Sequence, residues 1–234
     1  METWKKRISA SSHKESEDRF MADRNTFYIA YGSNLNVEQM QHRCPTATVY
    51  GKGKIMDYRL TFKTMGACAY ATIEPCEGDY VPVAVWCIQG KDEKSLDRYE
   101  GYPLHYKKST VKVVLDYETI IGMVYIMNHK AVYALPDRRY FSSVESGYQS
   151  FGLDKSKLHR AWCRIETGYD GCSEILRFYR RKIGLTQIQL AEQTGIPVRS
   201  IQKYESGERM LEKAHADAVL RLADVLGISP YLLA

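Results

Sequence analysis

The pattern of apolar residues changes once along this chain of 234 residues, and that change limits the folds open to it. Between Thr26 and about Ile126, short apolar segments are separated by glycines and charged turns, which is typical of antiparallel strands. After Gly171, apolar residues recur at every third or fourth position, which indicates helices. The sequence therefore predicts an α+β chain, with a β-rich domain first and an all-α domain second.

The β-rich part is expected to form a closed or covered sheet. Residues 81–88 are apolar at odd and even positions alike, so both faces of this strand should be buried, as in a central strand. Pro82 has no N–H group and is expected at the beginning of the strand or at an edge. The strands are predicted at residues 27–31, 55–62, 70–73, 81–88, 111–115 and 120–127.

Helices should interrupt and follow these strands. Residues 36–43 are expected to be helical up to a stop at Pro45, and residues 92–99 form a second helix. The segment 138–151 can also be helical, and the charged run 154–160 is expected to be a solvated face. We therefore expect helices to flank the sheet.

The chain divides at changes in composition. Residues 1–25 are polar and serine-rich, which favours a flexible leader, and a short docking helix through Trp4 and Ile8 is the alternative. The predicted β-rich domain covers 26–160, glycines near the end of 161–172 indicate a linker, and the helical domain covers 173–234.

Composition excludes several classes of protein. No apolar run approaches the roughly 20 residues that span a bilayer, and the N-terminus lacks the apolar core of a signal peptide, so a cytoplasmic location is expected. The six cysteines form no C-x-x-C pair and have no histidine at ligand spacing, which argues against a disulfide framework or a zinc site. The formal net charge of +5 tolerates a nucleic-acid partner without requiring one. We expect no metal and no cofactor.

A glycine turn follows the first predicted strand, in the run Tyr31-Gly32-Ser33-Asn34-Leu35. Glycine can adopt positive φ and approach a ligand closely, so the backbone N–H groups of this turn can face an anion or a carbonyl. The alternative is an ordinary turn in which Ser33 or Asn34 caps a helix that begins near Val37. Neither Ser33 nor Cys68 is expected to be a nucleophile, because no histidine lies in a recognisable relation to it.

Glu100 lies at the end of the second predicted helix, where the helix dipole disfavours an acid. Its neighbours Tyr99, Tyr102 and Tyr106 can desolvate the carboxyl group, which raises a carboxyl pKa toward the range useful for a general base. The alternative is a surface glutamate without a chemical role.

Together the Y-G-S-N-L turn and the run L-D-R-Y-E-G-Y-P, some 65 residues later, resemble the γ-glutamylcyclotransferase family, including AIG2-like proteins. The resemblance covers about residues 26–160 and implies a small mixed, β-barrel-like domain with flanking helices. It implies that the turn binds the γ-glutamyl group and that the acid of the second run is the catalytic base. The residues so implied are Glu100 as the base and Tyr31, Gly32, Ser33, Asn34 and Leu35 as the binding turn, with Tyr106 and Tyr125 as weaker candidates that we prefer to place in the core or on a sheet face.

The reaction explains the residue types. A γ-glutamyl amide releases 5-oxoproline when its own α-amine attacks the side-chain carbonyl, which requires no enzyme nucleophile. A base must remove the proton that the α-amine carries at neutral pH, and fixed N–H donors must stabilise the oxyanion. Folding the glutamyl chain back on itself supplies proximity.

The run from Leu185 to Gly207 resembles the Cro/C1 (XRE) family of helix-turn-helix domains, which implies double-stranded DNA as a partner. The helix after Pro197 would lie in the major groove, and binding as a homodimer to a palindrome would be expected. From Cys172 onward the chain has nine basic and seven acidic side chains, a weak excess for a DNA-binding domain. A helical bundle for oligomerisation or protein contact is the alternative. The residues expected to face DNA are Val198, Arg199, Gln202 and Lys203, with Gln187 placed for a phosphate.

Two functions from different classes follow. The first is a cofactor-free cyclotransferase that carries a DNA-binding domain. The second is a transcription regulator whose cyclotransferase-like domain senses a γ-glutamyl metabolite or mediates pairing. Glu100 favours the enzyme, because a sensor needs no base.

Overall fold

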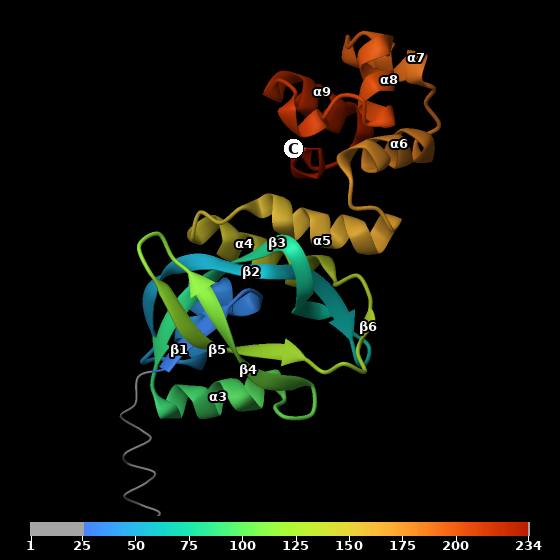
Figure 1. Ribbon diagram of the computed structural model, residues 1–234. Coiled ribbons are helices and arrows are strands. Elements are labelled where there is room, and N and C mark those ends of the chain that lie inside the picture. Colours follow the sequence, from blue (N-terminus) through green and yellow to red (C-terminus); the bar gives the residue numbers. More distant parts are fainter. Residues whose placement is uncertain (1–25, 234) are drawn as a thin grey trace, which may run out of the picture.

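A closed β-barrel forms the first part of the computed structural model, which describes residues 26–233 (Figure 1). Five strands close in the order β3-β1-β5-β4-β2, because β2 also pairs with β3, and β6 is added at the outer side of β2. β1 runs parallel to β5 and the other pairs are antiparallel, so the barrel is mixed. The predicted fold class is confirmed. The strands are β1 (Thr26–Ala30), β2 (Thr48–Thr64), β3 (Tyr70–Ile88), β4 (Tyr106–Val114), β5 (Thr119–Met127) and β6 (Val132–Tyr133).

Strands β2 and β3 are longer than the sequence predicts. The separate strands expected at 70–73 and 81–88 are parts of one strand, because β2 continues alongside and pairs with Glu74, Pro75 and Tyr80 between them. The register shifts twice, between Val49 and Gly51 and between Met56 and Tyr58, where Asp57 has a φ of 60°. Pro82 lies inside β3 and not at its beginning. It pairs with Lys54 on β2, before the pairing with β1 starts at Ala84, so one side of the strand has no ladder partner there.

Helices cover two opposite sides of the barrel (Figure 1). Asn36 begins α2, because its side chain accepts a hydrogen bond from Gln39 N at 3.0 Å, and a capping box of Gln89 and Asp92 begins α3. In α4, Gly147 is buried against the turn after β1, where a Cβ atom would lie 2.4 Å from Leu35 Cβ. The elements are η1 (Ser33–Leu35), α2 (Val37–Arg43), α3 (Gly90–Glu100), α4 (Arg138–Ser150) and α5 (Lys155–Thr167).

The charged run 154–160 is not simply a solvated face. It begins α5, in which Leu158 is fully buried and Lys157 Nζ lies 2.5 Å from Asp79 Oδ1 on β3. Helix α5 continues through position 160 to Thr167, so the segment expected as a linker starts inside a helix. The expected leader at 1–25, with Trp4 and Ile8, lies outside the described residues.

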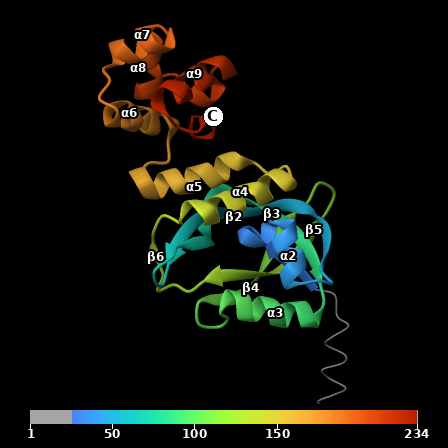
Figure 2. The same ribbon diagram turned by 180° about the vertical axis from the view of Figure 1, so that it is seen from behind.

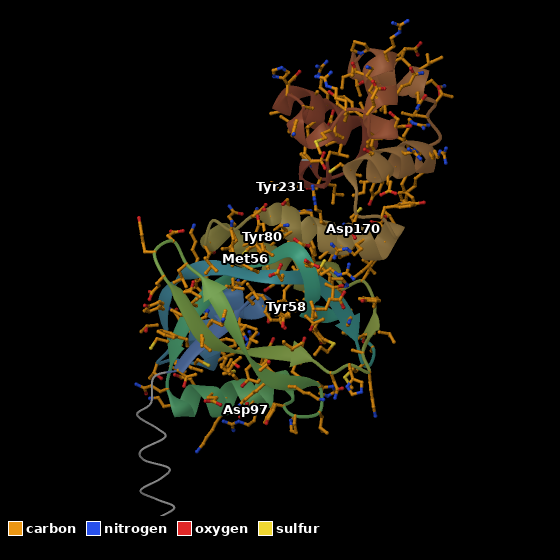
Figure 3. All side chains as sticks on the ribbon, viewed as in Figure 1. Met56, Tyr58, Tyr80, Asp97, Asp170 and Tyr231 are labelled. Atoms are coloured by element: carbon orange, nitrogen blue, oxygen red, sulfur yellow. The ribbon has the colours of Figure 1, made fainter. Side chains whose placement is uncertain are left out.

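The C-terminal part has its own hydrophobic core and is helical throughout (Figure 2). Thr186 and Gln189 form a capping box at the beginning of α7, and Gly195 ends that helix with a φ of 66°. The ring of Tyr231 lies 5.3 Å from that of His159, which places η3 against α5 (Figure 3). The elements are α6 (Cys172–Lys182), α7 (Gln187–Thr194), α8 (Val198–Ser206), η2 (Leu211–Lys213), α9 (Ala216–Leu226) and η3 (Pro230–Leu232).

Within residues 26–233, no helix is both long and apolar enough to cross a membrane.

Candidate active site

Glu100 is the last residue of α3, and its carboxyl group meets the turn that follows β1. Asn34 Nδ2 donates a hydrogen bond to Glu100 Oε1 at 2.9 Å and another to the Tyr28 hydroxyl at 2.7 Å. Arg43 Nη1 donates to the amide oxygen of Asn34. Because the oxygen of this amide is held by a cation, its N–H groups must face Tyr28 and Glu100, which fixes the orientation of the side chain.

Burial raises the pKa of Glu100 to about 7. The charge of Arg43 and the hydrogen bond from Asn34 act in the opposite direction, since both favour the ionised carboxylate. A carboxyl group with this pKa exchanges a proton readily near neutral pH, which is what a general acid/base requires.

Two cavities share Glu100 as a lining residue. The outer cavity has a volume of about 640 Å³ and the inner one of about 30 Å³, and both are lined by Ser33, Glu100, Tyr106 and Tyr140. Because the inner cavity is much smaller than the outer one, a ligand of any length must lie mainly in the outer cavity and reach inward with a small group.

Five tyrosines surround the inner cavity: Tyr28, Tyr31, Tyr106, Tyr125 and Tyr140. Three of their hydroxyl protons are used within the protein. Tyr31 donates to the backbone oxygen of Tyr125, Tyr106 donates to Ala71 O at 2.9 Å, and Tyr125 donates to Asp97 Oδ1 at 2.7 Å.

The hydroxyl of Tyr140 is arranged differently. It accepts a hydrogen bond from Ala71 N at 3.0 Å, and its own proton has no acceptor within the part of the chain that the structure describes. The Tyr28 hydroxyl likewise accepts a hydrogen bond, from Asn34. These two tyrosines can therefore donate a hydrogen bond to a ligand.

The structure corrects the expected role of Gly32. Its φ is −114° and its ψ −139°, so the turn does not use positive φ. A Cβ atom there would lie 3.2 Å from the Tyr140 hydroxyl and 3.3 Å from Ala71 Cβ, so glycine permits close packing against the tyrosine. The alternative in which Ser33 or Asn34 caps the next helix is wrong, because Asn36 caps α2.

The remaining turn residues lie in different environments. Ser33 and Asn34 open the short helix η1, and their N–H groups have no backbone acceptor within residues 26–233. Leu35 does not reach either cavity. Its side chain is fully buried in the hydrophobic core against Gly147, so the structure gives it a packing position and not a place beside a ligand.

Sequence reasoning missed three residues beside Glu100: Tyr28, Arg43 and Tyr140. Arg43 also donates to Gln39 Oε1 at 2.8 Å and to the Tyr99 hydroxyl at 2.7 Å. A position in the strand before the turn could have indicated Tyr28. No local signal in the sequence distinguishes Arg43 or Tyr140 from an ordinary helix residue.

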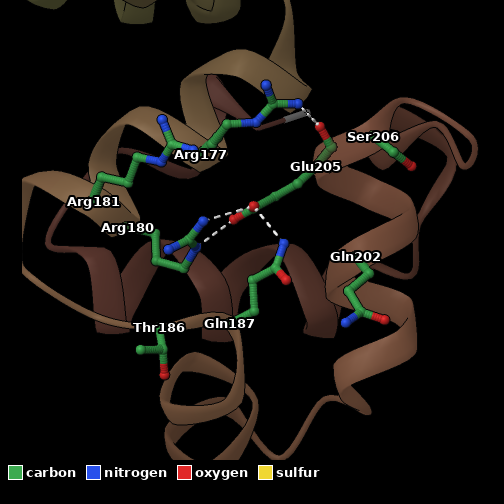
Figure 4. Close-up of a pocket in the computed structure, with 8 residues that line it drawn as sticks. All are labelled: Arg177, Arg180, Arg181, Thr186, Gln187, Gln202, Glu205 and Ser206. Atoms are coloured by element: carbon green, nitrogen blue, oxygen red, sulfur yellow. Dashed lines mark hydrogen bonds and ion pairs between the residues drawn. The ribbon is translucent and has the colours of Figure 1, made fainter.

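In the helical domain, Arg199, Gln202 and Lys203 are exposed on α8, and Val198 is half-buried. Lys203 Nζ lies 2.7 Å from Glu208 Oε1. Gln187 is less free than expected, because its amide donates to Glu205 Oε2 at 2.8 Å (Figure 4).

Glu205 also accepts hydrogen bonds from Arg180, at 2.5 Å from Nε and 2.8 Å from Nη2, in a buried ion pair. A cavity of about 480 Å³ adjoins this pair and is lined in addition by Arg177 and Arg181 of α6, which sequence reasoning also missed (Figure 4). The two arginines are one helical turn apart, which was a detectable signal.

Comparison with known proteins agrees with this architecture. The sequence profile described as gamma-glutamyl cyclotransferase, AIG2-like, matches residues 28–147, and a helix-turn-helix profile matches residues 176–233. A gamma-glutamylcyclotransferase of Bos taurus is 37% identical over 93 residues, which are 36% of this chain and 50% of the relative. The Homo sapiens gamma-glutamylcyclotransferase is 33% identical over 96 residues, which are 38% of this chain and 48% of the relative. The chain thus spans about half the length of these curated relatives.

Solved structures extend the likeness. A gamma-glutamyl cyclotransferase superposes with a TM-score of 0.55 at 25% identity, covering 62% of this chain and 88% of the other. An uncharacterized Homo sapiens protein superposes with a TM-score of 0.54 at 27% identity, with the same coverage of both chains. YkqA from Bacillus subtilis gives 0.54 at 17% identity over 66% of this chain and 59% of the other, which shows the shared fold alone. The chain belongs to the gamma-glutamyl cyclotransferase, AIG2-like family and carries a helix-turn-helix domain of the Cro/C1 type behind its cyclotransferase-like domain.

Proposed function

We propose that this chain is a γ-glutamyl cyclotransferase that releases 5-oxoproline from a γ-glutamyl amine or amino acid. The observation that carries the proposal is the position of Glu100. Its carboxyl group is buried and lines two cavities, and its pKa of about 7 suits proton transfer in both directions. The names of the relatives support the same reaction.

In the proposed reaction, Glu100 first accepts a proton from the substrate's α-ammonium group. The free amine then attacks the γ-carbonyl carbon, and the carbonyl oxygen becomes an oxyanion. This attack forms the ring. The oxyanion then re-forms the carbonyl as the bond from carbon to the leaving nitrogen breaks, and Glu100 returns its proton to that nitrogen. The attacking nitrogen releases its second proton, so that 5-oxoproline carries one N–H group and the amine departs as an ammonium ion. The step balances without a cofactor or an enzyme nucleophile.

Fixed donors stand around the reacting group. The N–H groups of Ser33 and Asn34 and the hydroxyl of Tyr140 can stabilise the oxyanion or hold the α-carboxylate. Asn34, held by Arg43, keeps one oxygen of Glu100 in place so that the other can face the substrate. Tyr31, Tyr106 and Tyr125 shape the inner cavity through their bonds to the barrel.

The direct test is release of 5-oxoproline from a panel of γ-glutamyl amino acids, glutathione and γ-glutamylamines. Glu100→Gln keeps the shape of the side chain but cannot carry a proton, so we expect kcat to fall by about a hundredfold or more. Glu77→Gln, at an exposed position of β3, is the matched control and should keep full activity. A Glu100→Gln variant as active as the parent, or a parent that turns over nothing, would reject the proposal.

We also propose that the helix-turn-helix domain binds double-stranded DNA through α8, with two chains on a palindrome. Arg199, Gln202 and Lys203 are exposed there and can contact bases, whereas Val198 can contribute an apolar contact only. Gln187 reaches a phosphate only if it leaves Glu205. A DNA partner agrees with the cytoplasmic location expected from the sequence.

A mobility-shift assay with the promoter of its own gene, at several salt concentrations, tests the DNA proposal. Arg199→Ala with Lys203→Ala should weaken binding at least tenfold and flatten its dependence on salt. Binding that is unaffected would exclude α8 as the recognition helix. A chain that turns over no substrate but binds DNA only with a γ-glutamyl ligand present would instead be a sensor, the second function considered for this architecture.

A further inference from the structure

Arg98 is a cationic side chain that lines the outer cavity and has no carboxylate partner within the described residues. Glu100 is the only acid among the cavity's lining residues within the described part of the chain, whereas Arg98 and His105 both line it. The Nε of Arg98 lies 3.4 Å from Lys94 O, and within residues 26–233 no ion pair links its guanidinium to a carboxylate. Arg43, in contrast, already donates to Asn34, Gln39 and Tyr99. Arg98 therefore has donors available for a ligand.

The proposed reaction places the leaving group beside this cation. In a γ-glutamyl amino acid, the carboxyl carbon is two bonds away from the leaving nitrogen that Glu100 must protonate. The group that binds this carboxylate therefore has to lie close to Glu100, and Arg98 precedes it by two residues on α3 and lines the same cavity. A guanidinium can bind a carboxylate with two parallel hydrogen bonds.

Among the described residues that line the outer cavity, no second acid could bind an amine on the leaving group. Once Glu100 serves as the base, a cationic leaving group would face Arg98 with no acid to pair with. The other walls include Met65, Met127 and Tyr70, which suit a small or apolar side chain.

We infer that Arg98 is a specificity-determining residue that selects substrates whose leaving amine bears a carboxylate, namely the γ-glutamyl derivatives of small or apolar α-amino acids. γ-Glutamyl diamines are rejected. This inference rests on the proposed function and names its substrate class.

Three substrates of similar size test it: γ-glutamylalanine, its C-terminal amide, and γ-glutamylputrescine. For the parent we expect kcat/KM to be about tenfold to a hundredfold higher for the acid than for the amide, since a charge-assisted hydrogen bond is lost. The preference should shrink as salt is added, because Arg98 is exposed. Arg98→Gln should reduce it to about twofold, and Arg98→Glu should favour the putrescine derivative. Lys91→Gln, on the same helix but away from the cavity, is the control for lost charge and should keep the parent's preference.

Binding separates this inference from the proposed function. Calorimetric titration of Glu100→Gln with the acid and the amide should show tighter binding of the acid, and the double variant with Arg98→Gln should bind both alike. If no variant turns over substrate but this binding preference holds, the cyclotransferase proposal fails and the role of Arg98 stands. An acid preference that is absent from the parent, or one that survives Arg98→Gln, overturns the inference.

Discussion

Replacing Glu100 with glutamine should stabilise the protein at neutral pH while it removes the proposed activity. The pKa of this carboxyl group is raised from 4.5 to about 7, so the folded state favours its neutral form. The associated stability is fully present below pH 4.5 and is lost as the pH rises through 7. Relative to low pH, the parent therefore loses about 3 kcal/mol of stability at pH 8, about 2 kcal/mol at pH 6 and almost nothing at pH 4, and Glu100→Gln should avoid this loss. These are upper values, because part of Glu100 faces the outer cavity.

The assay is urea unfolding of parent and Glu100→Gln at these three pH values, followed by tryptophan fluorescence. The chain has tryptophan only at positions 4, 86 and 162, so the signal does not come from the helix-turn-helix domain. Glu77→Gln, whose side chain is exposed, should show no difference that grows with pH. The reasoning is refuted if Glu100→Gln is no more stable than the parent at pH 8, or if the difference is the same at all three values.

Two further changes test the surroundings of the buried charges. Arg43→Gln removes the charge that lowers the pKa of Glu100, so the acidic limb of the kcat/KM profile should move to higher pH and the rate at pH 7 should fall severalfold. Arg43→Lys keeps the charge and should move the limb less. An acidic limb that does not move in Arg43→Gln would contradict the role of Glu100 as the base. Glu205→Ala leaves Arg180 buried without its carboxylate and should destabilise the helical domain by about 3–5 kcal/mol, measured by far-UV circular dichroism, whereas Arg180→Met with Glu205→Leu should recover most of that loss.

The sequence predicted those structural features that depend on interactions between neighbouring residues. The capping box of α7 and the glycine that ends it are determined by neighbouring residues, and the chain after Gly171 is helical, as its apolar period predicted. The pairing of the turn with Glu100 came from a resemblance of two short runs, and the structure brings Asn34 within 2.9 Å of that carboxyl group.

What the sequence could not predict depends on residues far apart. Arg43 and Tyr140 look like ordinary helix residues until α2 and α4 pack on the turn. Residues 74–80 look like a turn, but β2 continues beside them and pairs with Glu74, Pro75 and Tyr80. Gly32 was expected to provide positive φ, whereas the close approach of the Tyr140 hydroxyl requires it. Each of these misses arises from tertiary packing that overrides or adds to a local preference.

The choice between an enzyme and a sensor depends on the cost of the Glu100 carboxyl group. A domain that only bound a γ-glutamyl ligand would keep the hydrogen bond from Asn34 with glutamine in this position, since an amide oxygen accepts it equally well. It would also avoid a loss of about 3 kcal/mol above pH 7, a large share of the stability of a typical domain. An ionisable group kept at such a cost, lining two cavities and with a pKa near neutrality, is what proton transfer requires and what binding alone does not. The same comparison makes Glu100→Gln the decisive variant, because the sensor hypothesis predicts unchanged ligand binding and unchanged function, whereas the enzyme hypothesis predicts a more stable protein that has lost its activity.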